Sequence, residues 1–281
     1  MSNFWARTFT GLFMVFILLA AMAISYWFLA AIFFVVALLG LSEYYSLCAR
    51  GQAYPQKSAG MILGGVLYSG VIVAGRLRIP EVGIHPVAIA VIPAILAIFL
   101  PFILEIFRNR QNPLVNVAVT VTGIFYIALP LSLLSLLNGE EALRYRGLPI
   151  LLTGFFILTW FYDTGAYLFG KQFGKRRFFE RISPKKTWEG TIAGTIVALL
   201  TAAGIHALFP AIGRADWLAA ALLIVVFGTL GDLAESLFKR SLEMKDSGSL
   251  LPGHGGILDR FDTILVSIPF VLLYFYLRNL L

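Results

Sequence analysis

Acidic, basic and glycine residues gather near the end of an otherwise apolar chain, in the stretch Ser236–Asp262. Just before it, Asp232 and Glu235 interrupt an apolar run. If this segment is helical, Asp232, Glu235 and Lys239 share one face, because they are spaced at i, i+3 and i+7. A carboxylate among apolar membrane residues is costly and usually marks function. The pattern predicts a metal and phosphate site at a membrane surface.

Two of these carboxylates are candidate metal ligands. Mg²⁺ takes oxygen ligands and keeps substrate phosphates in its shell, so Asp232 and Asp259, from different helices, are expected to hold such an ion. Two simpler interpretations stay open. Glu235 and Lys239 can form an intrahelical pair, with Asp232 as helix polarity near the interface. Asp259 and Asp262 can cap the last helix, which fits Asp262 better than Asp259.

Glycines on both sides of His254 predict a turn in which backbone N–H groups approach a phosphate closely. His254 itself either bonds a phosphate or the substrate, or orients the loop, since an imidazole serves each role. Glu43 and Glu105 lie near the ends of apolar runs, where each can reach water, and they are assigned no role.

A second polar stretch follows the sixth apolar run. Ser183 is expected to cap a helix that has Pro184 at its first position. Lys185 and Lys186 then lie at a helix N-terminus, which disfavours cations unless an anion is bound. A bound phosphate resolves this conflict. Asp163 is expected to support the metal site, to contact a base, or to pair with a lysine of this loop.

The composition identifies an integral membrane protein. The chain of 281 residues is 59% hydrophobic and 13% charged, with a mean hydropathy of +0.85, whereas soluble domains carry about 25% charged residues. The net charge of +7 suits basic loops, lipid headgroups and nucleotide phosphates. Nucleic acid is not expected as a partner, because the cations are spread over several loops. The single cysteine, Cys48, excludes an intrachain disulfide.

Proline, glycine or charge clusters separate most of the apolar runs. The first two share one stretch hinged near Ser25, which is too long for a signal peptide and predicts an uncleaved span. We expect an all-α polytopic membrane protein of about nine transmembrane helices, near residues 8–25, 28–48, 58–75, 87–107, 114–137, 148–169, 187–209, 217–237 and 263–280. Residues 1–140 are expected to form a scaffold with the dimer surface, and 141–281 to carry the site, without a separate soluble domain.

Loop charge predicts the orientation. The N-terminus and the loops after the second, fourth, sixth and eighth runs contain 16 of the 22 Lys and Arg residues. The positive-inside rule then places the N-terminus in the cytoplasm and the C-terminus outside. Both polar stretches face the cytoplasm, where nucleotides are found.

The stretch Ser236–Asp262 closely resembles the signature of the bacterial-type phosphatidate cytidylyltransferases (CDP-diacylglycerol synthases). The shared pattern is a serine followed by Lys239-Arg240, Lys245-Asp246, a small residue, Pro252, His254-Gly255-Gly256 and Asp259-Arg260-Phe261-Asp262. The stretches Asp163–Tyr167 and Ser183–Gly190 also look like blocks of this family. The resemblance covers most of the second half of the chain, whereas the first half matches only in its hydrophobic spans.

The resemblance implies that CTP and phosphatidate react to give CDP-diacylglycerol and pyrophosphate. It implies Mg²⁺ held by Asp232 and Asp259, with K⁺ as a further cation, a homodimer, and the bacterial inner membrane. The residues expected to be catalytic are Asp232, Asp259, Lys239 and Arg240. Those expected to bind substrate are Asp163, Ser183, Lys185, Lys186, Thr187, Lys245, Asp246, His254, Gly255, Gly256, Arg260 and Asp262.

Two other functions fit part of the pattern. A secondary transporter for an anion also combines membrane carboxylates with basic loops, but it predicts ionisable residues near the midplane of several helices. A CTP-dependent lipid kinase would need a base for a neutral hydroxyl, a role open to His254. Ionisable residues gathered at one membrane face favour the cytidylyltransferase.

Overall fold

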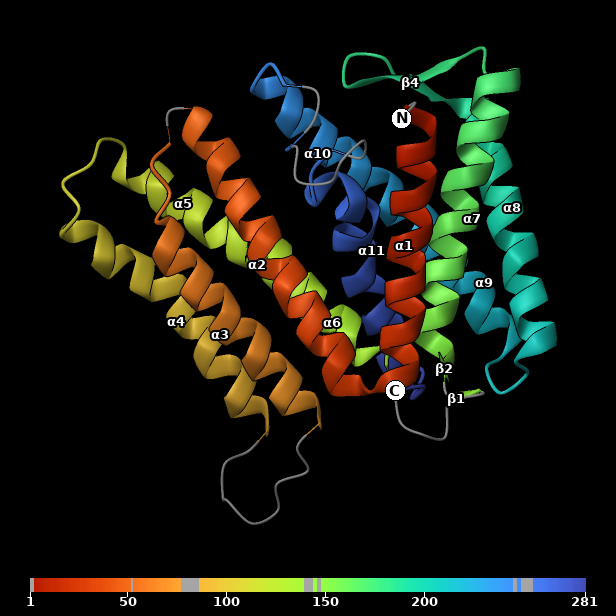
Figure 1. Ribbon diagram of the computed structural model, residues 1–281, viewed down its shortest axis with the longest axis horizontal. Helices are drawn as coiled ribbons and strands as arrows, with labels where there is room; N and C mark the ends of the chain where they lie inside the picture. Colours follow the sequence, from red (N-terminus) through yellow and green to blue (C-terminus); the bar gives the residue numbers. More distant parts are fainter. Residues whose placement is uncertain are drawn as a thin grey trace. The chain divides into compact units, whose positions relative to one another are not determined.

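The computed structural model describes residues 3–51, 53–76, 86–138, 144–145, 148–244, 247–248 and 255–281. These residues are almost entirely helical, with two short antiparallel hairpins (Figure 1). Within this part of the chain, seven helical segments are long and apolar enough to cross a membrane. The expected all-α polytopic membrane fold is therefore confirmed, while the number of nine spans and their orientation stay predictions.

The chain divides into two compact units. The first combines Met1–Leu136 with Asp246–Arg260, and the second combines Leu137–Lys245 with Phe261–Leu281. The short segment Asp246–Arg260 thus groups with helices from the opposite end of the sequence. The assignment of a scaffold role to residues 1–140 and of the site to 141–281 stays a prediction.

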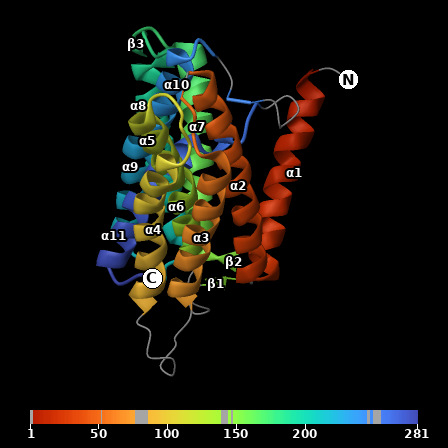
Figure 2. The same cartoon turned by 90° about the vertical axis from the view of Figure 1, so that its left-hand side faces the viewer.

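The helices of the first unit follow the predicted apolar runs closely. Ser25 separates the first two, and its Oγ accepts a hydrogen bond of 3.1 Å from the Phe28 N–H. The chain reverses there, so α1 and α2 run antiparallel (Figure 2). The helices are α1 (Asn3–Ile24), α2 (Tyr26–Arg50), α3 (Lys57–Arg76), α4 (Pro86–Ile106), α5 (Pro113–Gly123), the wider π-helical turn η1 (Ile124–Ala128) and α6 (Leu129–Leu136).

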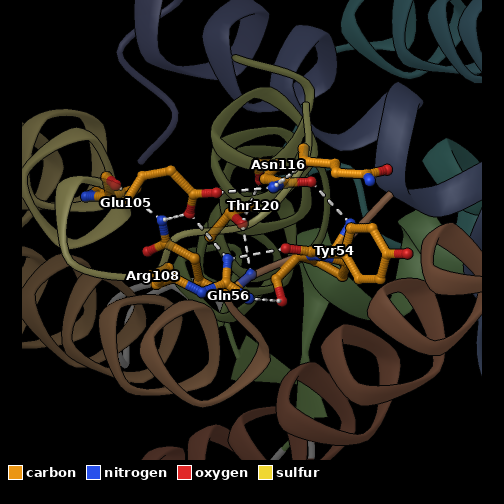
Figure 3. Close-up of polar contacts among 9 residues, drawn as sticks. Tyr54, Gln56, Glu105, Arg108, Asn116 and Thr120 are labelled. Carbon is orange, nitrogen blue, oxygen red and sulfur yellow. Dashed lines mark hydrogen bonds and ion pairs between the residues drawn. The ribbon is translucent and has the colours of Figure 1, made fainter. Parts of the chain in front are cut away.

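A buried polar network links α4 and α5 in the first unit (Figure 3). Glu105 accepts hydrogen bonds from Gln56 Nε2 at 2.6 Å, Asn116 Nδ2 at 2.7 Å and Arg108 Nη1 at 2.8 Å. Glu105 is only 7% exposed, and Asn116 is fully buried. The expectation that Glu105 simply reaches water is therefore wrong, because three donors satisfy its carboxylate inside the protein.

The same network fixes the connection between α2 and α3. The Tyr54 N–H donates to Asn116 Oδ1 at 2.8 Å, and the Gln56 N–H donates to Thr120 Oγ1 at 2.9 Å. Arg108 donates from the other side to the Tyr54 carbonyl at 2.8 Å. The connection is therefore held by side chains of α5 and by Arg108, which follows α4, because these groups satisfy its backbone N–H and carbonyl groups.

The second unit contains four more long helical segments and both hairpins. Figure 1 shows the β3–β4 hairpin at the end of α7 and the start of α8. The elements are β1 (Arg144–Tyr145), β2 (Leu148–Pro149), α7 (Ile150–Phe173), β3 (Arg177–Phe179), β4 (Ser183–Thr187), α8 (Trp188–Leu208), α9 (Arg214–Leu223), the π-helical turn η3 (Ile224–Gly228), α10 (Thr229–Ser241) and α11 (Leu258–Leu277), whose first residues belong to the first unit.

Small residues and one large aromatic ring determine the packing of the second unit. A Cβ on Gly194 of α8 would lie 3.0 Å from the Tyr162 carbonyl oxygen of α7, so glycine permits the close approach of these helices. Trp217 of α9 is fully buried, and its ring meets Phe275 of α11 edge-on at 6.2 Å between centroids. Close packing at a glycine thus joins α7 to α8, and a contact between aromatic rings joins α9 to α11.

The predicted helix cap at Ser183 is wrong, although α8 begins at Trp188, next to the predicted start of the seventh span at residue 187. Ser183 does not cap a helix, because Ser183–Thr187 pairs as strand β4 with β3. The cap is Thr187, whose Oγ1 accepts a hydrogen bond of 3.2 Å from the Gly190 N–H. Lys185 and Lys186 therefore lie on a strand before the helix, and the unfavourable position in a first helical turn does not arise.

Candidate active site

Three aspartates from three helices of the second unit form a cluster. Asp163 on α7 interacts electrostatically with Asp262 on α11 and Asp232 on α10. Lys186 of β4 lies beside them, with its Nζ 2.5 Å from Asp232 Oδ2. The structure thus brings together four of the residues that the sequence predicts for the site.

Close helix packing explains why these residues meet. Gly228 of η3 and Gly231 of α10 both lie against α11, where a Cβ on Gly228 would be 2.5 Å from Thr263 Cγ2. The Tyr162 hydroxyl of α7 forms a short hydrogen bond with Thr229 Oγ1 of α10. These contacts place α10 and its Asp232 between α7 and α11.

Among the described residues, carboxylates outnumber ammonium groups at the cluster. Lys239 Nζ lies 2.7 Å from Glu235 Oε2, which confirms the intrahelical pair that the spacing allowed. In the described part of the chain, Lys186 interacts with all three aspartates and Lys239 interacts with Asp262. Carboxylates that interact with one another in this way favour binding of a cation.

The loop before α11 surrounds the carboxylate of Asp259 in the first unit. Asp259 Oδ2 accepts hydrogen bonds from the Ser247 N–H at 3.0 Å, the Ser247 hydroxyl at 2.9 Å and the Gly256 N–H at 2.8 Å. Glu43 of α2 bonds the same loop, accepting from the Ile257 N–H at 2.8 Å and forming a short hydrogen bond with the Ser247 hydroxyl. Two carboxylates therefore share one serine.

The two glycines after His254 pack against these carboxylates. Gly255 has φ of +81°, a conformation that favours glycine, and a Cβ there would lie 2.5 Å from Asp259 Oδ2. The Gly256 N–H, predicted to approach a phosphate, donates to Asp259 instead. Phosphate binding by these residues stays a prediction, and their observed role is to let the backbone fold around a carboxylate.

The interpretation of Asp262 as a helix cap is wrong. Helix α11 begins at Leu258 rather than near residue 263, so Asp259 lies in its first turn and Asp262 in its second. The turn starts early because Asp259 accepts the Gly256 N–H just before the helix. Asp262 therefore does not cap the helix, and its carboxylate interacts with Asp232 in the aspartate cluster.

The other predicted site residues are exposed, engaged in local structure, or undescribed. Thr187 is buried as the α8 cap, and Ser183 is partly buried on β4. Exposed side chains are those of Lys185, Arg240 and Arg260. Lys245, Asp246 and His254 lie outside the described residues. Asp232 and Asp259 fall in different units, so their joint binding of a metal stays a prediction.

The donor set suits a hard divalent cation. Within the described ranges, no three His, Cys, Asp or Glu side chains are arranged around one point as a complete metal site. Mg²⁺ does not need such a cage, because it keeps several waters and is typically held by one or two carboxylates together with substrate phosphates. Carboxylate oxygens of the cluster therefore fit Mg²⁺, and the described residues of the site offer no sulfur or imidazole ligand of the kind that holds a structural zinc ion.

Two residues that contact the site were missed by the sequence analysis. Glu43 was expected to reach water, yet its carboxylate bonds Ser247 and Ile257, more than 200 positions later in the chain. Ser247 follows Lys245-Asp246 in the polar stretch, and no role was predicted for it. The available signal was an acidic residue within an apolar run, since such a group needs a partner.

Fold and site together define a class: a polytopic membrane protein with carboxylates and lysines of several helices gathered into a polar site. The chain belongs to the cytidylyltransferase family, whose model matches residues 5–278.

Curated relatives with the name phosphatidate cytidylyltransferase are similar to part of the chain. The protein of Bacillus subtilis is 49% identical over 123 residues, which cover 43% of this chain and 45% of the relative. Those of Staphylococcus aureus (47% over 128 residues, 45% and 48%) and Haemophilus influenzae (44% over 137 residues, 47% of each) are comparable. The chain thus matches about half the length of these relatives.

Proposed function

We propose that this protein is a phosphatidate cytidylyltransferase, which transfers the cytidylyl group of CTP to phosphatidate and releases pyrophosphate. The observation that carries the proposal is the aspartate cluster with its adjoining lysines, in a member of the cytidylyltransferase family. The names of the partial relatives give the lipid substrate. The surplus of carboxylates over ammonium groups among the described residues supports the proposal of a divalent cation at this site.

The reaction places few demands on acid–base chemistry. The phosphate of phosphatidate is already anionic near neutral pH, so its oxygen attacks the α-phosphorus of CTP without a strong base. A new P–O bond forms as the bond to the β-phosphate oxygen breaks, and pyrophosphate departs in line. Catalysis of this kind consists of positioning and charge neutralisation.

The roles of this chain's residues follow from their charges. When bound, Mg²⁺ would neutralise phosphate oxygens and polarise the reacting phosphorus. Asp232 and Asp259 are the proposed ligands, and Asp259 lies three residues before Asp262 on α11, so both project from one helix face. Lys186, Lys239, Lys185 and Arg240 are proposed to hold the triphosphate and the leaving group. Lys186 would exchange its contact with Asp232 for a phosphate oxygen.

The membrane arrangement is part of the proposal. Diacyl tails remain in lipid while the phosphate reaches the polar site at the interface. Loop charge supports a site that faces the cytoplasm of a bacterial inner membrane. We also propose a homodimer, and K⁺ as a further cation of the site.

The experiment uses purified protein in detergent with labelled CTP, Mg²⁺ and phosphatidate. The proposal expects labelled CDP-diacylglycerol and release of pyrophosphate. Absence of a CDP-lipid would overturn it, and phosphorylation of a lipid alcohol would identify a lipid kinase instead. Asp259→Asn is expected to fold and to lose activity; near-normal turnover would remove Asp259 from the metal site.

A further inference from the structure

We propose that Glu43 of α2 is a positioning residue that orients Asp259 through the Ser247 hydroxyl and the turn at Gly256 and Ile257. This inference rests on the metal-binding role proposed for Asp259. It assigns helix α2 a specific role in the reaction. Glu43 lies outside the signature stretch Ser236–Asp262.

The first observation is that Glu43 holds both described parts of the loop at once. Its Oε1 accepts from the Ser247 hydroxyl, and its Oε2 accepts from the Ile257 N–H at 2.8 Å. Ser247 precedes the undescribed part of the loop, and Ile257 immediately precedes α11. One rigid helix therefore fixes the distance between the two loop ends.

The second observation is that Asp259 depends on the same groups. All three of the loop donors described above converge on Asp259 Oδ2, and two of them belong to Ser247, which is only 4% exposed. If Glu43 is removed, Asp259 is the one carboxylate partner that the Ser247 hydroxyl keeps among the bonds described, and the side chain of Ser247 is no longer tied to α2. The loop that carries the donors to Asp259 then loses its bonds to α2 at both Ser247 and Ile257.

The third observation is the fit of the loop backbone around Glu43. A Cβ on Gly248 would lie 3.0 Å from Glu43 Cδ, and a Cβ on Gly256 would overlap Glu43 Oε1 and Ser247 Oγ. A larger residue at position 256 would displace Glu43 or Ser247 from the observed contact, and one at position 248 would crowd Glu43. The loop backbone therefore packs directly against the Glu43 carboxylate. A loosely placed surface acid would not need glycines at these positions.

Hydrogen-bond geometry distinguishes positioning from direct binding of a cation. A glutamine at position 43 can accept the Ile257 N–H with its oxygen and donate to Ser247 Oγ with its amide. The serine proton is then directed to Asp259. The neutral side chain thus preserves the chain of hydrogen bonds, whereas an alanine breaks it. A direct cation ligand would instead need the negative charge.

The test compares Glu43→Gln, Glu43→Ala and Ser247→Ala with wild type and with Glu180→Ala, an exposed acid on the β3–β4 turn that serves as the matched control. CDP-diacylglycerol formation is measured over a Mg²⁺ titration at saturating CTP, and thermal unfolding in detergent is measured in parallel. These readouts separate the Mg²⁺ requirement and turnover from stability.

We expect Glu43→Ala to raise the Mg²⁺ concentration for half-maximal rate, or to lower turnover, by about 10- to 100-fold, as outer partners of metal ligands do. Ser247→Ala is expected to show the same change to a smaller degree, and Glu43→Gln to stay within about threefold of wild type. If Glu43→Ala does not fold, the serine and glutamine variants decide.

An unchanged Mg²⁺ requirement and turnover in Glu43→Ala and Ser247→Ala would overturn the inference. A loss in Glu43→Gln as deep as that in Glu43→Ala would also overturn it, in favour of a direct ligand. Failure of the proposed function itself looks different, because the wild-type protein would then make no CDP-diacylglycerol at any Mg²⁺ concentration.

Discussion

Glu105 in the first unit and Asp232 in the second are both carboxylates on apolar helices, but their surroundings differ. Glu105 is buried and accepts hydrogen bonds from Gln56, Arg108 and Asn116. The Asp232 side chain is 32% exposed, and its described partners are Lys186 and Ser236. In addition, Asp232 shares its surroundings with two other aspartates.

The difference separates a structural carboxylate from a reactive one. The Glu105 carboxylate already accepts hydrogen bonds from three side chains, so it has a structural role. Loss of these hydrogen bonds would leave buried polar groups unsatisfied. The aspartates of the second unit repel one another, so a bound cation would lower their energy. An acidic residue in a membrane span is therefore best classified by its partners rather than by its presence.

The largest effect on activity is expected for Asp232→Asn, which removes one anionic donor from the cluster. Activity should fall at least about 100-fold. Thermal unfolding should change little, because a partly exposed ion pair with Lys186 contributes at most about 1 kcal/mol. The CDP-lipid assay and unfolding in detergent check both parts. Normal turnover of Asp232→Asn would show that Asp232, like Glu105, is not needed for the reaction.

The largest effect on stability is expected for Glu105→Ala. Loss of its acceptor oxygens leaves one N–H of the Gln56 amide and one N–H of the Asn116 amide without their buried acceptor, although each amide keeps a bond to a backbone carbonyl. This loss should lower the free energy of unfolding by about 3 kcal/mol. Activity per folded molecule should be retained. Denaturant unfolding measures the loss, with Glu105→Gln as the milder control. A stable but inactive protein would show that Glu105 takes part in the reaction.

A smaller effect is expected for Lys186→Met, which removes the ammonium group beside Asp232. If this group moves to the triphosphate, the KM for CTP should rise about tenfold, the value of one charge-assisted hydrogen bond. Steady-state kinetics with varied CTP measure the change. An unaltered KM would mean that Lys186 serves only as the counter-ion of Asp232.

The smallest effect is expected for Lys175→Ala on the β3–β4 side of the second unit. Its backbone N–H donates to Glu189 Oε2 at 3.0 Å, so the turn does not depend on the exposed ammonium group. Turnover should stay within about twofold of wild type, since an isolated surface charge contributes little. A large loss in the same assay would extend the site to this loop.

Apolar periodicity and loop signals were sufficient to predict the helices of the described chain. Runs of about 20 apolar residues have few structural alternatives in a membrane, and the boundary at Ser25 follows from its capping hydroxyl. The predicted seventh span begins where α8 begins, but its cap was wrongly assigned to Ser183. Ser183-Pro184 is typical of a helix start, and only its pairing with Arg177–Phe179 makes it a strand. Sequence spacing does not reveal such a hairpin.

The acidic residues of the site were predictable from their cost in a membrane, but their partners were not. Asp163, Asp232 and Asp262 were all singled out, and the structure joins them through the close packing of η3 and α10 on α11. Glu43 and Ser247 meet across 204 positions of sequence. No local pattern encodes that contact, which depends on tertiary packing.

Mn²⁺ can show whether the divalent cation binds at the cluster of Asp163, Asp232 and Asp262 or at the buried network around Glu105. Mn²⁺ suits carboxylate ligands as Mg²⁺ does, and its binding to purified protein in the presence of CTP is measurable by electron paramagnetic resonance. We expect Asp232→Asn to lose bound Mn²⁺ and Glu105→Gln to retain it at the wild-type level. Retention by Asp232→Asn together with loss by Glu105→Gln would contradict this expectation.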